Sequence, residues 1–553
     1  MKYRIQEFTS RQRGRVYRYQ WFGYSYRDEN TRKPTFKCLV NLTGLPEELI
    51  ARLRSSLAGG DAEAPCGPVQ FLGSMRLGPE AVGVHILETL GIDRELSAHL
   101  PEQDVPLVKA LILDRVLEPF PHSRKSLFEN LPGSALARVC GVDCAALKLE
   151  SMYYALDHLR PLQERIEQGL FRRNGAGKSR MYLYDITSSY FEGNACPLEA
   201  FGYNRDGKKG RKQIVIGMLC SRDGCPVGVE VFEGNTSDQT TVMGRIDSMR
   251  RRFGIDELVF VGDRGMLTRA RRDDLSADEY EKVKFITALS REEFVRFVED
   301  DSHPLQLTLF DRQNLAEVTH EGVKYVLSYN PELEARNRAD RERLMGETEK
   351  FLAGIKACVE KGRLKRRDAI ARRLYRKLDK WKCGKFFETE YDEGKFDYRK
   401  KEDLVASYAN MDGFYVFVTD SLDLTAEETR EEYRGLQRVE QVFRTMKTTD
   451  LHVRPIRLWN PDRVRAHVFV CMLAYMVVWK ARQLFAEFIH PEDELRVSLR
   501  TQWEKLGTVQ IGRVRIGDAV QEQLAPVDAQ CKALLRAAGL TPAALAKRYL
   551  KTQ

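Results

Sequence analysis

Two hydrophobic periodicities run along the chain, and each predicts a different kind of element. Between Gly78 and Arg173 the apolar residues recur every three or four positions, as in Val82 and Ile86. This spacing places them on one side of helices, so we expect a mostly helical region there. From Arg180 onward, short apolar runs bounded by turn residues replace the helical spacing, and these runs indicate strands.

The elements predicted after Arg180 follow the order β-β-β-α-β-α-β. The turn Arg222-Asp223-Gly224 joins the second and third strands as a hairpin, and a helix is expected from Ser237 to Phe253. Three antiparallel strands followed by strands that enter through helical crossovers form one mixed sheet of the ribonuclease-H-like kind. The strands are expected at Met181 to Asp185, Ile214 to Ser221, Pro226 to Glu233, Leu258 to Asp263 and Val283 to Leu289.

A final helix should follow such a sheet, but residues 291–412 intervene. They contain strand-like pieces and long charged helices, which indicates an inserted α+β domain. Lys and Arg outnumber Asp and Glu by more than two to one between Glu334 and Lys385, and Lys365, Arg366 and Arg367 form part of a dense basic run. Such a run is either a solvated helix face or a DNA contact. A strand from Gly413 to Asp420 and a helix from Thr425 to Lys447 then resume the sheet pattern.

The two ends of the chain give weaker patterns. The first 60 residues are basic and rich in tyrosine, and they predict a short hairpin followed by a helix from Pro46 to Leu57. The last segment reads as helices. We therefore expect a multidomain α/β protein with these parts: 1–70, a basic hairpin and helix; 71–178, a helical and DNA-binding domain; 179–290 with 413–490, the ribonuclease-H-like core; 291–412, the inserted domain; and 491–553, a C-terminal helical segment.

Composition and charge narrow the class of protein only slightly. The 553 residues are too many for one core, and 43% hydrophobic content is typical of globular domains. The net charge of +9 favours a polyanionic partner, but it is spread over 89 basic and 80 acidic residues. Local clusters, such as the basic loop from His122 to Lys125 in the helical region, carry more information.

Cysteines and apolar runs indicate an intracellular protein without a membrane segment. The 11 cysteines contain no CxxC pair, and Cys140 and Cys144 lack the partners of a zinc site, so we expect reduced thiols. The apolar run from Val468 to Trp479 is shorter than the ~20 residues that span a bilayer, which predicts a buried helix. The N-terminus lacks the apolar stretch of a secretory signal.

Three carboxylates are placed for phosphoryl chemistry. Asp185 and Asp263 each lie where a predicted strand ends, and these strands are neighbours in the predicted sheet, while Glu440 lies on the late helix that would cross the sheet. Three converging carboxylates repel unless cations neutralise them, and oxygen ligands favour Mg²⁺ or Mn²⁺. A pair of such ions serves in-line displacement at phosphorus. The alternative is that each acid is a cap or a salt-bridge partner.

The late helix carries further polar residues at regular spacing. Tyr433, Glu440 and Lys447 are seven residues apart, so they share one face of a continuous helix. Glu440 can bind metal, Lys447 and Arg444 can hold phosphates, and Tyr433 can position a phosphate or stack beside a base. An ordinary apolar stripe is the alternative, because Leu436, Val439 and Phe443 would pack on the same side.

Taken together, these motifs resemble the DDE transposases of bacterial insertion sequences. The resemblance is to the insertion-sequence-four-like superfamily, which is marked by a Tyr, Arg, Glu, Lys signature around the last acid. Within it, the chain most resembles the sixteen-thirty-four-like branch. It covers roughly residues 180–290 and 413–480. The matching blocks are Tyr184-Asp185-Ile186-Thr187-Ser188, Phe191-Glu192-Gly193, Phe201-Gly202-Tyr203-Asn204-Arg205-Asp206, Glu233-Gly234-Asn235-Thr236-Ser237-Asp238, Gly262-Asp263-Arg264-Gly265-Met266 and Tyr433 to Lys447.

The resemblance implies roles for individual residues. It assigns Asp185, Asp263 and Glu440 to the catalytic triad, and Tyr433 and Lys447 to the signature. Leu436 stands where the signature has Arg, so Arg434 or Arg438 would have to substitute. The residues expected to contact DNA are Tyr433, Arg434, Arg438, Arg444, Lys447, Lys208, Lys209, Arg211, Lys365, Arg366 and Arg367.

The function implied is cut-and-paste transposition. Two Mg²⁺ ions, or Mn²⁺ in their place, would serve hydrolysis that frees 3′ hydroxyls and then strand transfer into target DNA. The partners implied are the terminal inverted repeats, the target duplex and a second copy of the chain, in the bacterial cytoplasm at the nucleoid. Three alternatives stay open: a nuclease of the same fold, a non-catalytic DNA-binding descendant, and a tyrosine recombinase using Tyr433 with Arg434, His452 and Arg454.

Overall fold

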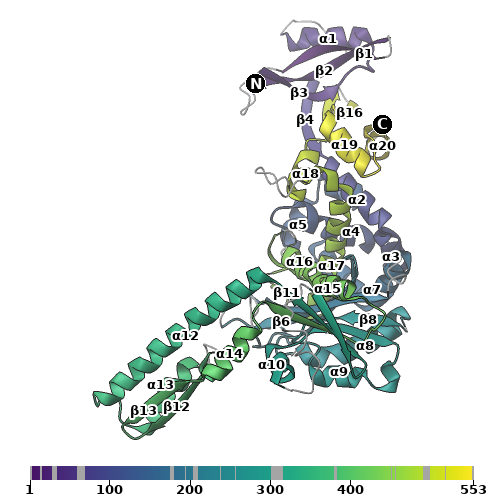
Figure 1. The fold of residues 1–553 in the computed structure, drawn as a ribbon. Coiled ribbons are helices and arrows are strands. Elements are labelled where there is room, and N and C mark those ends of the chain that lie inside the picture. The colour runs from purple at the N-terminus through teal and green to yellow at the C-terminus, as the bar shows by residue number, and fades with distance from the viewer. Residues whose placement is uncertain are drawn as a thin grey trace.

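The protein is elongated and has four visible parts. In the computed structural model, a small sheet and the C-terminal helices lie at one end, helices occupy the middle, a large sheet lies at the other end, and a long arm projects from that sheet (Figure 1). The residues described are 3–12, 15–27, 34–58, 69–174, 180–192, 195–203, 210–236, 238–255, 257–299, 315–378, 383–449, 451, 453–454, 456–489, 498–516 and 519–550.

The large sheet has eight strands in the order β10-β11-β14-β9-β8-β5-β6-β7. The pairs β5–β8 and β8–β9 are parallel and the other pairs are antiparallel, so the sheet is mixed. The strand and helix order expected over residues 181–289 is confirmed. The strands are β5 (Met181–Tyr190), β6 (Gln213–Ser221), β7 (Pro226–Glu233), β8 (Leu258–Val261), β9 (Val283–Ala288), β10 (Leu315–His320), β11 (Val323–Tyr329) and β14 (Phe414–Thr419).

Alternating residues of β5 bury against two different layers. Tyr182 and Tyr184 belong to the core shared with α8 (Asp238–Phe253), whereas Met181 and Leu183 belong to the core shared with α16 (Leu436–Arg444) and α17 (Pro461–Leu484). Because successive side chains of a strand point to opposite faces, both faces of the sheet are covered.

Helix α17 is the central helix of the second layer. It packs on β7, α4 (Asp104–Leu117) and α7 (Leu149–Arg173). By length and composition it is apolar enough to cross a membrane, but 83% of its apolar window is buried inside the protein, as expected for a core helix. The predicted helical region is confirmed, and its other members are α2 (Gly78–Thr89), α3 (Ile92–His99), α5 (Arg124–Asn130) and α6 (Ala135–Cys140).

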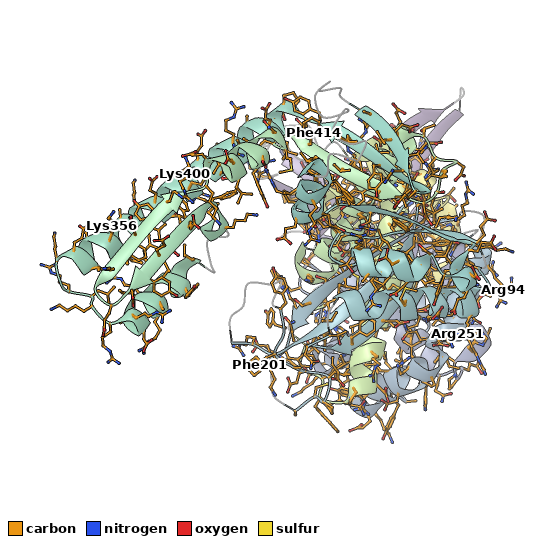
Figure 2. All side chains as sticks on the ribbon, turned by 60° about the horizontal axis from the view of Figure 1, so that its bottom comes forward. Arg94, Phe201, Arg251, Lys356, Lys400 and Phe414 are labelled. Carbon is orange, nitrogen blue, oxygen red and sulfur yellow. The ribbon has the colours of Figure 1, made fainter. Side chains whose placement is uncertain are left out.

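The segment that leaves the sheet is shorter than the 291–412 insertion expected from the sequence. After α10 (Arg291–Glu299), β10 and β11 extend the large sheet, because β11 is buried and pairs with β14. Among the described residues, 331–378 and 383–410 form the projecting arm, in which Figure 2 labels Lys356 and Lys400. The arm consists of α12 (Pro331–Glu360), α13 (Arg367–Leu378), β12 (Phe387–Asp392), β13 (Lys395–Lys400) and α14 (Glu402–Asn410).

Both terminal segments contain more strands than the sequence predicted. The expected 1–70 hairpin and helix is a three-stranded sheet with one helix, and the expected 491–553 helical segment contains a hairpin as well. The hairpin strand β15 pairs with β4, so a domain boundary at residue 70 would cut a strand. The elements are β1 (Tyr3–Gln12), β2 (Arg15–Arg27), β3 (Pro34–Asn41), α1 (Glu47–Leu57), β4 (Val69–Arg76), α18 (Leu499–Leu506), β15 (Gln510–Ile516), β16 (Ala519–Leu524), α19 (Ala529–Ala537) and α20 (Pro542–Tyr549).

A buried carboxylate ties the arm to the sheet. The side chain of Asp412 is 1% exposed, and its Oδ1 accepts a hydrogen bond of 2.8 Å from Arg291 on α10. Its Oδ2 pairs with Arg341 on α12. The Arg291 guanidinium also lies over the Tyr408 ring, 5.3 Å from its centroid. The orientation of the arm therefore depends on one acid held between two arginines.

We expect Asp412→Ala to destabilise the arm by about 3 kcal/mol, because it leaves two arginines without their carboxylate. The measurement is urea-dependent proteolysis of the arm in the full chain. Asp340→Ala is the control, since Asp340 and Arg343 form an exposed pair on α12, 3.5 Å apart, and exposed pairs contribute about 1 kcal/mol or less. Equal effects of the two substitutions would contradict the anchoring role of Asp412.

Candidate active site on the central strands

The two predicted aspartates lie at the same level on neighbouring strands. In the parallel pair β5–β8, Leu183 is the partner of Val261. Asp185 follows Leu183 by two residues, and Asp263 follows Val261 by two residues. Because parallel strands advance together along the sheet, the two carboxylates leave their strands at matching positions.

Asp185 points toward the layer that contains α16. Leu183 lies on this face, since a Cβ on Gly435 at the start of α16 would lie 3.4 Å from the Leu183 methyl carbons. Thr187 lies on it too, because its hydroxyl accepts a hydrogen bond from Lys447 Nζ. Residues at i and i+2 share one face of a strand, so Asp185, between Leu183 and Thr187, also faces this layer.

Backbone amides orient both carboxylates. Asp185 Oδ1 accepts a hydrogen bond of 2.7 Å from the Ile186 amide, and Asp263 Oδ1 accepts one of 2.8 Å from the Met266 amide. The hydrogen bond from Met266 to Asp263 closes a turn directly after β8. Met266, in this turn, is fully buried. Both aspartates are half-buried. Their positions are therefore defined by the main chain around them, as a binding site requires.

The helix that carries Glu440 is divided into three segments. It begins with a capping box at Thr425 and Glu428, runs through α15 (Ala426–Arg434), turns at Gly435 and continues as α16. After Arg444 the chain forms a π-helix over Thr445–Thr449. The single continuous helix predicted from Thr425 to Lys447 is wrong in this respect, because a π turn takes up more residues than an α turn and shifts the positions after it.

The three signature residues consequently lie in different surroundings. Tyr433 packs against the rings of Tyr415 and Phe417 on β14, with centroids 5.9 and 5.0 Å away, and its hydroxyl lies 3.3 Å from the Tyr415 hydroxyl. Burial raises the Tyr433 pKa, and the nearby Tyr415 and Asp263 raise it further. Glu440 is exposed on α16, whereas Lys447 reaches β5 from the π turn.

The structure brings together two of the three acids. Asp185 and Asp263 share a level in the sheet, because Leu183 and Val261 are partners in the parallel pair. Glu440 lies on the exposed side of α16, next to the buried Val439. Among the residues that the structure describes, no group of three His, Cys, Asp or Glu side chains is close enough to hold a metal ion. The carboxylate donors fit a hard divalent cation, but Glu440 must approach the aspartates to complete a three-acid site.

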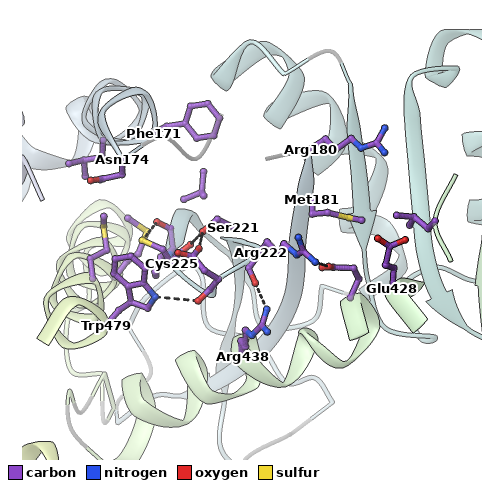
Figure 3. A pocket seen from close by; sticks show the side chains of 18 residues that line it. Phe171, Asn174, Arg180, Met181, Ser221, Arg222, Cys225, Glu428, Arg438 and Trp479 are labelled. Carbon is purple, nitrogen blue, oxygen red and sulfur yellow. Dashed lines mark hydrogen bonds and ion pairs between the residues drawn. The ribbon is translucent and has the colours of Figure 1, made fainter. Parts of the chain in front are cut away.

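The predicted basic contacts are distributed over several surfaces. Arg438 donates to the Arg222 carbonyl in the β6–β7 turn, beside a cavity of about 960 Å³ (Figure 3). Met181 at the start of β5 lines this cavity, whereas Asp185 lies in the middle of this ten-residue strand, which continues to Tyr190 instead of ending at Asp185 as predicted. Arg434 pairs with Glu431 and Arg211 with Glu192, each at 3.5 Å. Arg211, Arg434 and Arg438 are exposed, and so are Arg444 on α16 and, at the arm tip, Lys365, Arg366 and Arg367. Lys208 and Lys209 lie outside the described residues.

Two contacts differ from what the sequence indicated. Thr187 was not singled out, although its position two residues after Asp185 places it on the same face of a strand. The basic loop from His122 to Lys125 is a candidate DNA contact in the sequence, but Arg124 is half-buried, with its Nε inside the protein, and it bonds His467, while His122 Nδ1 lies 2.6 Å from Asp114. Charge in the sequence did not reveal that these side chains face the interior.

Comparison with known proteins assigns the region that contains these residues to a protein family. Residues 178–477 match the family model described as "Transposase DDE domain". No curated protein matches the chain. Among solved structures, the chain is similar to a piggyBac transposase synaptic complex with hairpin DNA, at 8% identity and a TM-score of 0.34, covering 77% of this chain and 76% of that one.

Two further solved structures are more distant. The Mos1 mariner paired-end complex with Mn is 14% identical, with a TM-score of 0.14, covering 30% of this chain and 59% of that one. The Mos1 transposase paired-end complex with the left transposon end is also 14% identical, with a TM-score of 0.13, covering 29% and 58%. These scores are low, so the family match alone assigns the chain.

We expect Asp263→Ala to lower the free energy of unfolding by about 1 kcal/mol, because the Met266 amide loses its acceptor. Asp263→Asn keeps an oxygen at the same place and should leave stability nearly unchanged. Urea unfolding of both variants measures the difference. If Asn destabilises the chain as much as Ala, the charge of Asp263 rather than its hydrogen bond stabilises this turn.

Proposed function

The chain belongs to the DDE transposase family and is a DNA transposase; we propose that it works by cut-and-paste transposition with Asp185, Asp263 and Glu440 as its catalytic acids. In this proposal the eight-stranded sheet is a ribonuclease-H-like core, and the arm is a domain inserted into it. The observation that carries the proposal is the matching register of Asp185 and Asp263 on the parallel strands β5 and β8. Such placement is unusual for two independent caps.

The acids supply the ligands that this chemistry requires. Asp185 and Asp263 would hold divalent ions between them, Mg²⁺ or Mn²⁺, and Glu440 would complete the set from α16. When bound, a pair of such ions lowers the pKa of the attacking hydroxyl and stabilises the leaving oxygen.

Lys447 is the best-placed cation for the scissile phosphate. Its amino group donates to Thr187, two residues from Asp185 on the same face of β5. A Lys ammonium at this place would bind a phosphate oxygen, orienting the strand while the acids act on the adjacent bond. Arg444, exposed one turn before, would extend the contact along the backbone.

The basic run on the arm supports a second region of DNA contact. Lys365, Arg366 and Arg367 are exposed between α12 and α13, far from the acids along the arm. We propose that they hold duplex DNA while the core acts on the terminal inverted repeats and the target. Two element ends require two active sites, so a homodimer is proposed as the working form, in the bacterial cytoplasm at the nucleoid.

The alternatives differ in how well the structure supports them. A nuclease of the same fold would use the same acids and stop after hydrolysis, so only its products distinguish it. A non-catalytic descendant is disfavoured because all three acids are present. A tyrosine recombinase is disfavoured because burial raises the pKa of Tyr433 and its ring packs inside the protein, which makes it a poor nucleophile. His452, its proposed partner, lies outside the described residues.

We expect Asp185→Asn, Asp263→Asn and Glu440→Gln each to lower DNA cleavage and strand transfer on the order of a thousandfold or more, because each removes a charged ligand without changing shape. The substrate is DNA carrying the element's own ends, with Mg²⁺ or Mn²⁺, and gel-shift affinity should be retained. Glu431→Gln is the matched control, being an exposed acid on the adjoining helix. Wild-type cleavage by any of the three variants would remove that residue from the triad.

The double substitution Arg366→Gln with Arg367→Gln should weaken DNA binding at every sequence alike. The slope of log affinity against log salt should fall by about 0.9 for each phosphate that the arm no longer neutralises. Fluorescence anisotropy over a salt series measures it, with Lys532→Gln as control, since Lys532 is exposed on α19 at the other end of the molecule. An unchanged slope would mean that the arm is only a solvated surface.

A further inference from the structure

The π-helix after α16 is held in place by the segment that follows it. Its residues Thr445 and Met446 accept hydrogen bonds from the Leu451 and Val453 amides, at 3.2 and 2.8 Å. Lys447 follows the two acceptors in the π-helix and precedes the residues that donate these hydrogen bonds. A π turn is rare and needs support from its surroundings. The position of the Lys447 amino group therefore depends on where the Leu451–Val453 segment is fixed.

That segment is fixed from the helical layer by His467 on α17. His467 is 3% exposed, its Nε2 lies 3.2 Å from the Val453 carbonyl oxygen, and its Nδ1 lies 2.7 Å from Arg124 Nη2. A guanidinium can only donate, so Nδ1 accepts from Arg124 and Nε2 carries the proton that is donated to Val453. The neighbouring Leu451 carbonyl accepts a longer bond of 3.4 Å from Arg115.

The charges around His467 keep it in this one state. Burial lowers its pKa well below the usual value, and the cations Arg124 and Arg115 lower it further. Burial also lowers the pKa of Arg124, to about 10, which leaves it protonated near neutral pH. If Nδ1 of His467 were protonated, its N–H would point at the Arg124 guanidinium. Nδ1 could then no longer accept the hydrogen bond from Arg124. The neutral tautomer is thus the one compatible with both hydrogen bonds.

We propose that His467 is a positioning residue for Lys447: held by Arg124, it fixes the Val453 carbonyl and through it the π turn that presents Lys447 to β5. The proposal rests on the proposed role of Lys447 at the scissile phosphate. It assigns a structural role to the half-buried Arg124, whose position in a basic loop suggested a surface contact. It also explains why the helical domain and the catalytic layer must be packed together for the site to form.

A double-substitution cycle in the full chain tests whether His467 acts through Lys447. His467→Leu should lower cleavage of end DNA about tenfold when Lys447 is present, and have little further effect in a Lys447→Met background, because coupled residues are not additive. His467→Gln supplies an acceptor and a donor from one amide and should restore activity. Phe469→Leu is the control: it is equally buried on α17, and its effect should be additive with Lys447→Met.

A second readout does not depend on catalysis. Competitive acetylation followed by mass spectrometry should show Lys447 reacting severalfold faster in His467→Leu than in wild type, relative to the exposed Lys125, and unchanged in His467→Gln. Additive substitution effects or unchanged Lys447 acetylation in His467→Leu would overturn the inference. If Asp185→Asn still cleaves DNA, the proposed function fails instead, and acetylation still decides the role of His467.

Discussion

The parallel pairing of β5 and β8 is the constraint on which the site depends. It sets Leu183 beside Val261, and that register carries Asp185 and Asp263 to the same level two residues later. A shift of one residue in either strand would send one carboxylate to the opposite face of the sheet. Both strands are buried on both faces, so the hydrophobic cores on either side maintain the register. The packing that holds the register of the sheet therefore also places the two aspartates.

The second requirement is that the helical layer meets the sheet correctly. In the proposed site Glu440 would come from α16 and Lys447 from the π turn, and the buried face of α16 rests on β5 and β6. This layer is tied to the N-terminal helical region through α17, which packs on α4 and α7. Segments far apart in sequence therefore determine where the cationic side of the site lies. Because Glu440 is exposed on α16, the proposed three-acid site requires DNA or metal binding to bring it to the aspartates.

Periodicity predicted what is local, and it failed where partners are distant. The strands around Asp185 and Asp263 were predictable because apolar runs and the Asp223-Gly224 turn are local signals. The pairing of β15 with β4 was not, because its partner lies at the other end of the chain and neither strand is long. The seven-residue spacing of Glu440 and Lys447 predicted one continuous helix face, which is wrong, because a π turn cannot be recognised in the pattern of apolar residues. Arg124 misled for a related reason, because burial of a charge depends on tertiary contacts.

The proposed function requires Asp185, Asp263 and Glu440 to surround one metal site. Replacing the metal with Fe²⁺ and generating hydroxyl radicals cuts the protein chain next to the bound ion, and the cut positions can be read by mass spectrometry. Cuts close to all three acids, suppressed together by excess Mg²⁺, are the result expected. Cuts near Asp185 and Asp263 without one near Glu440, or cuts that Mg²⁺ does not suppress, would contradict the three-acid site.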